Sequence, residues 1–150
     1  MALFNLITDH FTDIEISNAA AALQTFETII LSKCRNLTPE ESSQYGSIDE
    51  QMKLFINKVL QYHNTQPALD SPDVDWTEFM ADAKDRNFLE ASMMRLAGFT
   101  EVMKDTKILH DHDNFQNGLL DKKYAKYKAD TGSGGLWEVK SNEYAQFFTP

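Results

Sequence analysis

The sequence predicts an all-α protein, a bundle of four to five main helices with a short apolar segment behind a glycine-rich hinge. Three observations predict this fold class. Apolar residues recur about every 3.6 positions, polar capping residues stand where these repeats begin, and no alternating run of β-branched residues occurs. The expected helices cover residues 13–35, 47–63, 75–97, 99–113 and 118–129.

The first expected helix, residues 13–35, begins at a capping box. Thr12 and Glu15 stand three residues apart, so each side chain can satisfy a backbone N–H group that is unpaired at a helix start. The apolar stripe of this helix runs from Ile16 to Cys34. Lys33 and Arg35 flank Cys34 and could make its thiol reactive, but because free cysteine is among the most buried residue types, we expect a buried, unreactive thiol.

Two further helix starts follow. Thr38 precedes a proline and opens a short helical turn that ends at Gly46. Ser47 and Glu50 then repeat the capping-box spacing and open the helix over residues 47–63. The apolar stripe of this helix consists of Ile48, Met52, Phe55, Val59 and Tyr62.

The segment 63–75 is expected to be a surface connection, because it contains two prolines and several Asp and Asn residues. Asp75 with Glu78 marks the start of the next helix, over residues 75–97.

The remaining helical part of the chain is expected to be broken into shorter helices. The apolar stripe changes phase near residues 85–87, and Gly98 is a weak point in any helix. An Asn-Gly pair at 117–118 suggests a turn. These signals separate the expected helices 99–113 and 118–129 from what precedes them.

The C-terminal tail differs from the rest of the chain. The sequence DTGSGG at residues 130–135 cannot continue a helix and predicts a hinge. We therefore expect a helical bundle domain over residues 1–130 and a hinge with an apolar tail over residues 131–150. The tail either packs on its own bundle or binds a partner, and its candidate partner-binding residues are Trp137, Tyr144, Phe147 and Phe148.

Charge and composition exclude several classes of function. The 150 residues carry a net charge of -9, which disfavours nucleic acid and anionic membranes as partners. A single cysteine excludes an internal disulfide and fits a reducing compartment. No apolar run approaches the roughly 18 residues that would span a bilayer, and the N-terminus lacks a basic signal-peptide region. A cytoplasmic location is expected.

The strongest candidate for metal chemistry is the run of His110, Asp111, His112 and Asp113, with His63 as a further ligand. Imidazole and carboxylate groups together can bind a divalent metal. Neighbouring residues of one helix point to different faces, however, so the run can equally be a solvated helix end. We therefore expect no cofactor, and a divalent metal is the alternative.

One basic and aromatic cluster stands out in this acidic chain. It contains Lys122, Lys123, Lys126 and Lys128. The lysines could bind an anion. They could also simply complement the dipole of a helix near its C-terminus, while the adjacent tyrosines pack in the core.

No pattern of nucleophile and base, and no glycine-rich cofactor motif, occurs in the sequence. The expected function is therefore non-enzymatic: association with a protein partner or with itself, through the tail. The alternative is a metal-dependent helical-bundle hydrolase that uses His63, His110, Asp111 and His112.

Overall fold

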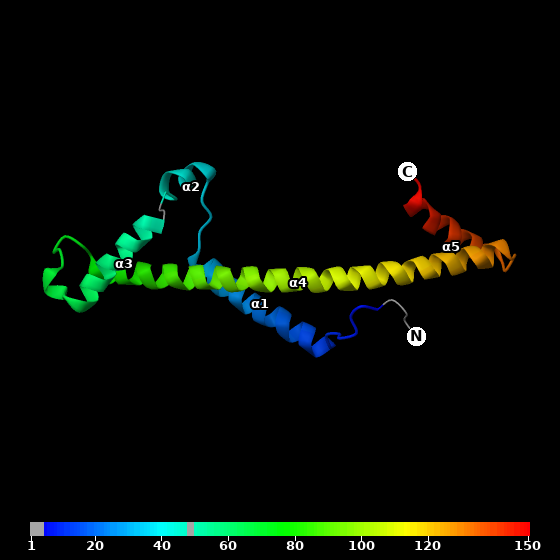
Figure 1. The fold of residues 1–150 in the computed structure, drawn as a ribbon, viewed down its shortest axis with the longest axis horizontal. Coiled ribbons are helices and arrows are strands. Elements are labelled where there is room, and N and C mark those ends of the chain that lie inside the picture. Colours follow the sequence, from blue (N-terminus) through cyan, green and yellow to red (C-terminus); the bar gives the residue numbers. More distant parts are fainter. Residues whose placement is uncertain (1–4, 48–49) are drawn as a thin grey trace. The chain divides into compact units, whose positions relative to one another are not determined.

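The computed structural model of the protein describes residues 5–47 and 50–150. Within these ranges all regular secondary structure is helical, and no strand occurs (Figure 1). The all-α class is therefore confirmed. The α-helices are α1 (Asp13–Lys33), α2 (Pro39–Tyr45), α3 (Glu50–Thr65), α4 (Trp76–Asp130) and α5 (Gly135–Ala145). Two 3₁₀ turns, η1 (Pro67–Leu69) and η2 (Gln146–Phe148), follow α3 and α5.

Helices α1, α2 and α4 begin at the capping residues that the sequence indicated. Thr12 and Glu15 form a complete capping box at α1, since each side chain bonds to the backbone N–H of the other residue at 3.0 and 3.1 Å. Thr38 and Glu41 form another at α2. The Asp75 carboxylate accepts the Glu78 N–H at 3.1 Å at the start of α4. The capping box expected at Ser47 and Glu50 spans residues 48–49, which lie outside the described residues. The expected stripe residue Ile48 is one of these two.

The helix boundaries in the second half of the chain were predicted wrongly. The expected helices 75–97, 99–113 and 118–129 are one continuous helix, α4, of 55 residues. Gly98 and Gly118 lie inside it with no atom within 4 Å of the position of an added Cβ. A glycine costs a helix interior only about 1 kcal/mol relative to alanine, so one such residue need not end a long helix.

The contacts within the chain divide it into two units. The first comprises residues 11–93, and in it α3 contacts the first turns of α4. Lys53 of α3 lies 3.9 Å from Glu90 of α4, and the same Glu90 pairs with Arg86 at 3.2 Å. These ion pairs are largely solvent-exposed and contribute little individually.

Side-chain contacts hold the connection between α3 and α4. His63 Nδ1 lies 2.6 Å from the Asp70 carboxylate, and the His63 ring stacks on Trp76 with centroids 4.5 Å apart and planes 4° apart. The Trp76 indole N–H donates to the Ser71 carbonyl at 2.9 Å. The expected surface connection 63–75 thus contains the end of α3, the turn η1 and a ring stack that fixes the start of α4.

The end of α1 also meets α4 within the first unit. Ile29, Ile30 and Cys34 line a shallow cavity of about 150 Å³ together with Phe88 and Leu89. Cys34 is nevertheless exposed, so the expectation of a buried thiol was wrong. The reason is its place at the C-cap, one residue beyond the last turn of α1.

The second unit comprises residues 94–150 and the described part of the N-terminal segment, residues 5–10. This segment, the N-terminal arm, has no helix and is bound to α4 by side chains. The Asp113 carboxylate accepts the Leu6 N–H at 2.8 Å and the Ile7 N–H at 3.1 Å. Asn117 donates to the Asn5 side chain at 3.2 Å. Asp113, 6% exposed, and Ala125 are the two residues that are buried in the described part of the chain.

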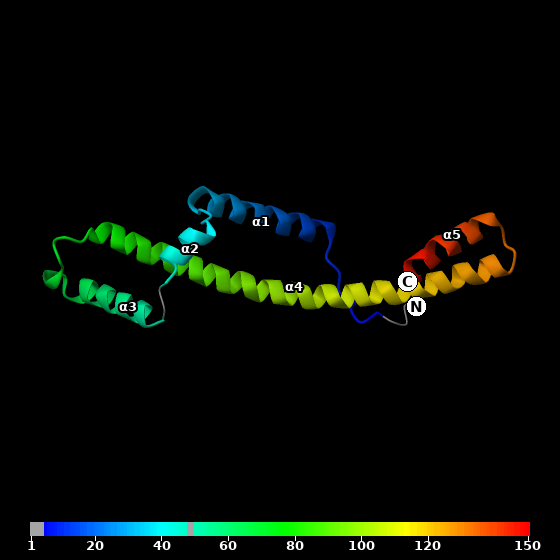
Figure 2. The same ribbon diagram turned by 90° about the horizontal axis from the view of Figure 1, so that it is seen from above.

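The helix α5 turns back along the last turns of α4, and the two form a helical hairpin (Figure 2). The turn between them is short and tight. Gly132 has φ +72°, and the Ser133 N–H donates to the Lys128 carbonyl at 3.1 Å, which closes the C-terminal end of α4. No described helix of either unit is long and apolar enough to cross a membrane.

Candidate interaction surface

The α4–α5 hairpin is held by two of the four aromatic residues predicted to bind a partner. The ring of Trp137 in α5 packs edge-on against Tyr124 of α4, with centroids 5.6 Å apart and planes at 84°. The hydroxyl of Tyr144 donates to the Asp121 carboxylate of α4 at 2.8 Å. Both side chains are half-buried. Trp137 and Tyr144 therefore bind the tail to its own chain.

Asp121 is the polar centre of this hairpin. Its carboxylate also accepts a hydrogen bond from Lys140 Nζ, with N–O distances of 3.0 and 3.2 Å. The Lys140 and Tyr144 donors lower the pKa of Asp121 below its ordinary value. The same contacts with Asp121 raise the pKa values of Tyr144 and Lys140. All three groups thus keep the protonation state that favours the hairpin near neutral pH.

The other two aromatic residues of the tail line a cleft. Phe147 is 84% exposed and Phe148 is 52% exposed. They form one side of an open cleft of about 460 Å³, and α4 forms the other. The cleft, hereafter the hairpin cleft, is lined by Asn114, Phe115, Gly118, Leu119, Lys122, Tyr144, Phe147 and Phe148. Its wall is therefore mainly aromatic and aliphatic, with one ammonium group.

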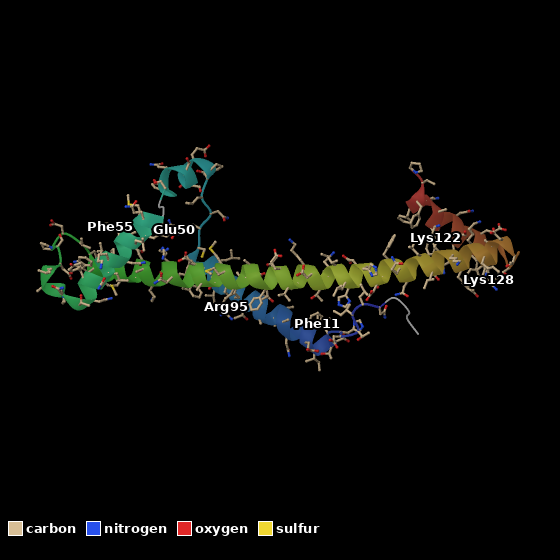
Figure 3. All side chains as sticks on the ribbon, in the orientation of Figure 1. Phe11, Glu50, Phe55, Arg95, Lys122 and Lys128 are labelled. Carbon is tan, nitrogen blue, oxygen red and sulfur yellow. The ribbon has the colours of Figure 1, made fainter. Side chains whose placement is uncertain are left out.

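The lysine cluster lies on the last turns of α4, below α5 (Figure 3). Lys122 Nζ lies 4.7 Å from the centroid of Phe148, and Lys128 Nζ lies 5.7 Å from that of Trp137. Lys126 pairs with Asp130 at 3.0 Å. Lys123 makes no hydrogen bond, ion pair or ring contact with any described residue. Two of the four lysines thus cover aromatic rings of the tail.

The residues of the metal hypothesis have other partners in the structure. His63 binds Asp70 in the first unit. In the second unit, the His110 ring lies 5.6 Å from that of His10, and Asp111 pairs with Lys107 at 2.6 Å. His112 lies 3.4 Å from Asp113. Among the described residues, no group of three or more His, Cys, Asp or Glu side chains is arranged to hold a metal ion.

Sequence reasoning did not assign Phe115 and Leu119 to an interaction site, although a signal for them exists. They are four residues apart and so lie on the same face of α4. Lys122 continues that face three residues later. What the sequence did not reveal was that the tail folds back beside this face, so that Phe115 and Phe148 border one cleft.

Comparison with protein families, with curated proteins and with solved structures finds no match to this chain. The surface itself is therefore the basis for a functional assignment.

Proposed function

We propose that this protein works by association with another protein chain, and that the hairpin cleft receives a large apolar side chain of that partner. The observation that carries the proposal is the exposure of Phe147, 84%, at the edge of an apolar cleft that the protein's own side chains leave open. Contiguous exposed apolar surface is rare on proteins that do not use it for binding.

The aromatic residues of the tail have two different roles, and this difference supports the proposed function. Trp137 and Tyr144 fix α5 on α4, so the backbone that carries Phe147 and Phe148 is held in place before a partner arrives. A partner that binds there does not have to order this backbone, which lowers the entropic cost of binding. Aromatic residues that border a concave apolar surface are typical of the few interface positions that dominate binding energy.

A photo-crosslinking experiment tests the proposal. Phe147 is replaced by p-benzoylphenylalanine in the full chain, which is then irradiated in extract of the cells that produce it. We expect a discrete crosslinked adduct. It should disappear with Leu119→Asp, because that substitution places a charged carboxylate in the apolar wall of the cleft. The matched control is Ile108→Asp, because Ile108 is also exposed on α4 but does not line the cleft.

The expected result is an adduct that survives Ile108→Asp and is lost with Leu119→Asp. An adduct that is equally strong in both variants, or no adduct at all, contradicts the proposal. Circular dichroism of each variant verifies that helical content is retained.

A further inference from the structure

Two histidine rings of the second unit lie against each other, one from the N-terminal arm and one from α4. The ring centroids of His10 and His110 are 5.6 Å apart, and the ring planes are at 33°. Neither ring makes a hydrogen bond or an ion pair with any described residue. His63 and His112, in contrast, each have a carboxylate partner. The ring nitrogens of the His10–His110 pair are therefore available to a ligand from outside the chain.

The distance between the two rings fits the sharing of one metal ion. A bond between a metal and an imidazole nitrogen is about 2.0–2.1 Å long, which places the ring centroid about 3.2 Å from the metal. Two imidazoles on one ion, with a tetrahedral or slightly wider angle between the bonds, therefore have centroids about 5–6 Å apart. The observed 5.6 Å lies in this range. The face-to-face stack of His63 on Trp76 is different, with centroids 4.5 Å apart and planes at 4°.

The charges beside the pair favour a cation. Asp9 precedes His10 in the arm, and Asp111 and Asp113 follow His110 in α4. Lys107, one helical turn before His110, is already paired with Asp111 at 2.6 Å. The Asp9 carboxylate makes no hydrogen bond or ion pair with any described residue. A cation that binds between the rings thus meets a local excess of negative charge.

We infer that His10 and His110 together bind one divalent transition-metal ion, which links the N-terminal arm to α4. Imidazole nitrogen suits zinc, copper and nickel, whereas magnesium and calcium prefer oxygen ligands. Water fills the other coordination positions, because no group of three or more His, Cys, Asp or Glu side chains converges in the described part of the chain. The inference does not rest on the proposed function, since neither histidine lines the hairpin cleft.

This site shares only His110 with the metal cluster that the sequence suggested. His112 is two residues further along the same helix, so it points to a different face of α4. The second ligand comes instead from residue 10, which is 100 positions away in the sequence and belongs to the same unit.

Calorimetric titration of the untagged full chain with Zn²⁺, at about pH 7.5 where imidazole is mostly uncharged, tests the two ligands. His10→Phe and His110→Phe each keep a ring in place but remove its nitrogens. Each should weaken Zn²⁺ binding at least about tenfold, because even the loss of an outer-shell partner costs roughly 10–100-fold in affinity. His63→Phe is the matched control, since Phe retains a ring beside Trp76 in the other unit, and it should leave the affinity unchanged.

Hydrogen exchange of the arm tests the link to α4. An ion that binds only when the arm is attached reduces the open population about elevenfold at ten times its dissociation constant. The N–H groups of Leu6 and Ile7, which bond to Asp113, should then exchange about tenfold more slowly. A chelator should reverse the effect, and Mg²⁺ in place of Zn²⁺ should not produce it. The effect should also be absent in His10→Phe.

Electron paramagnetic resonance of the Cu²⁺ complex tests the same site without any substitution. The spectrum of the unaltered chain should show coupling to two imidazole nitrogens. Coupling to a single nitrogen overturns the inference, as does Zn²⁺ binding that is absent or that survives either His10→Phe or His110→Phe. Equal weakening by His63→Phe would indicate binding by imidazoles in general and also overturns it. Zn²⁺ binding that leaves the exchange of Leu6 unchanged contradicts the link between arm and helix.

Discussion

Asp113 and Leu6 lie 107 positions apart in the sequence, yet both carboxylate oxygens of Asp113 accept the Leu6 N–H at 2.8 Å. The carboxylate also accepts the Ile7 N–H, so one buried side chain binds two consecutive backbone groups of the N-terminal arm. Hydrogen bonds to an ionised acceptor are stronger than those between neutral groups. We conclude that Asp113 is the principal attachment of the arm to α4.

Replacement of Asp113 by alanine should release the arm. The Leu6 and Ile7 N–H groups lose their acceptor, so their hydrogen exchange should accelerate on the order of ten- to a hundredfold. NMR-detected exchange measures this directly. Asp111→Ala is the control, because Asp111 is an exposed neighbour whose partner is Lys107 and not the arm. Unchanged protection of Leu6 in Asp113→Ala contradicts the attachment.

The arm should also respond to acid. Burial acts to raise the pKa of Asp113, but the N–H groups of Leu6 and Ile7 and the side chain of His112 outweigh it, and the pKa lies below its ordinary value of 3.8. A group with a lowered pKa stabilises the folded state above its unfolded pKa and loses that contribution as the pH falls through the folded pKa. We expect the arm to stay bound near neutral pH and to detach only below about pH 4. Leu6 exchange followed through an acid titration, with Asp113→Asn as the pH-independent reference, measures this.

The α4–α5 hairpin should be stable only within a window of pH. The pKa of Asp121 is lowered by Lys140 and Tyr144, so its contribution is lost when the pH falls below the carboxylate range. The pKa values of Tyr144 and Lys140 are raised, so their contributions are fully present below their ordinary values of 10.0 and 10.5 and disappear as the pH rises through the higher folded values. Trp137 fluorescence in a Trp76→Phe background should change at both ends of this window.

Asp121→Asn provides the control for the hairpin. The amide cannot carry the negative charge that raises the pKa of Tyr144, so the alkaline change in Trp137 fluorescence should begin at lower pH. An alkaline change at the same pH in both proteins would show that Asp121 does not govern the hairpin.

The ring stack at the start of α4 should contribute measurably to stability. Asp70→Asn weakens the bond to His63 that holds the ring on Trp76, and we expect a loss of about 1 kcal/mol in the free energy of unfolding. Thermal or urea unfolding measures the loss. Asp73→Asn should change stability little, because the Asp73 contact to Ser71 uses its backbone N–H and not its carboxylate.

The sequence predicted the starts of α1, α2 and α4 well because each of them depends on a few neighbouring residues, such as Thr12 and Glu15. It failed where a local signal was overridden. Asn117 before Gly118 is typical of a turn, but here the Asn117 amide bonds to the Asp113 carbonyl four residues earlier and to Asn5 of the arm. A contact with a residue 112 positions away cannot be inferred from local sequence pattern.

The sequence could indicate only part of the candidate site, because the rest depends on contacts between distant residues. The sequence singled out Trp137, Tyr144, Phe147 and Phe148 as one group because they are large apolar residues close together. It could not separate the two that hold the hairpin from the two that border the cleft. That separation depends on the direction in which α5 returns along α4, which the tight turn at Gly132 allows.

The continuity of α4 can be tested at its glycines. If Gly98 lies inside an uninterrupted helix, as the structure shows, Gly98→Ala should raise the free energy of unfolding by up to about 1 kcal/mol, since alanine favours the helix and its Cβ meets no neighbouring atom. Gly132→Ala should instead lower it, because φ +72° strains any residue with a Cβ. Urea unfolding of both variants provides the comparison. A helix that breaks at residue 98, as the sequence alone suggests, would give no gain with Gly98→Ala, and a flexible hinge at residue 132 would tolerate the alanine.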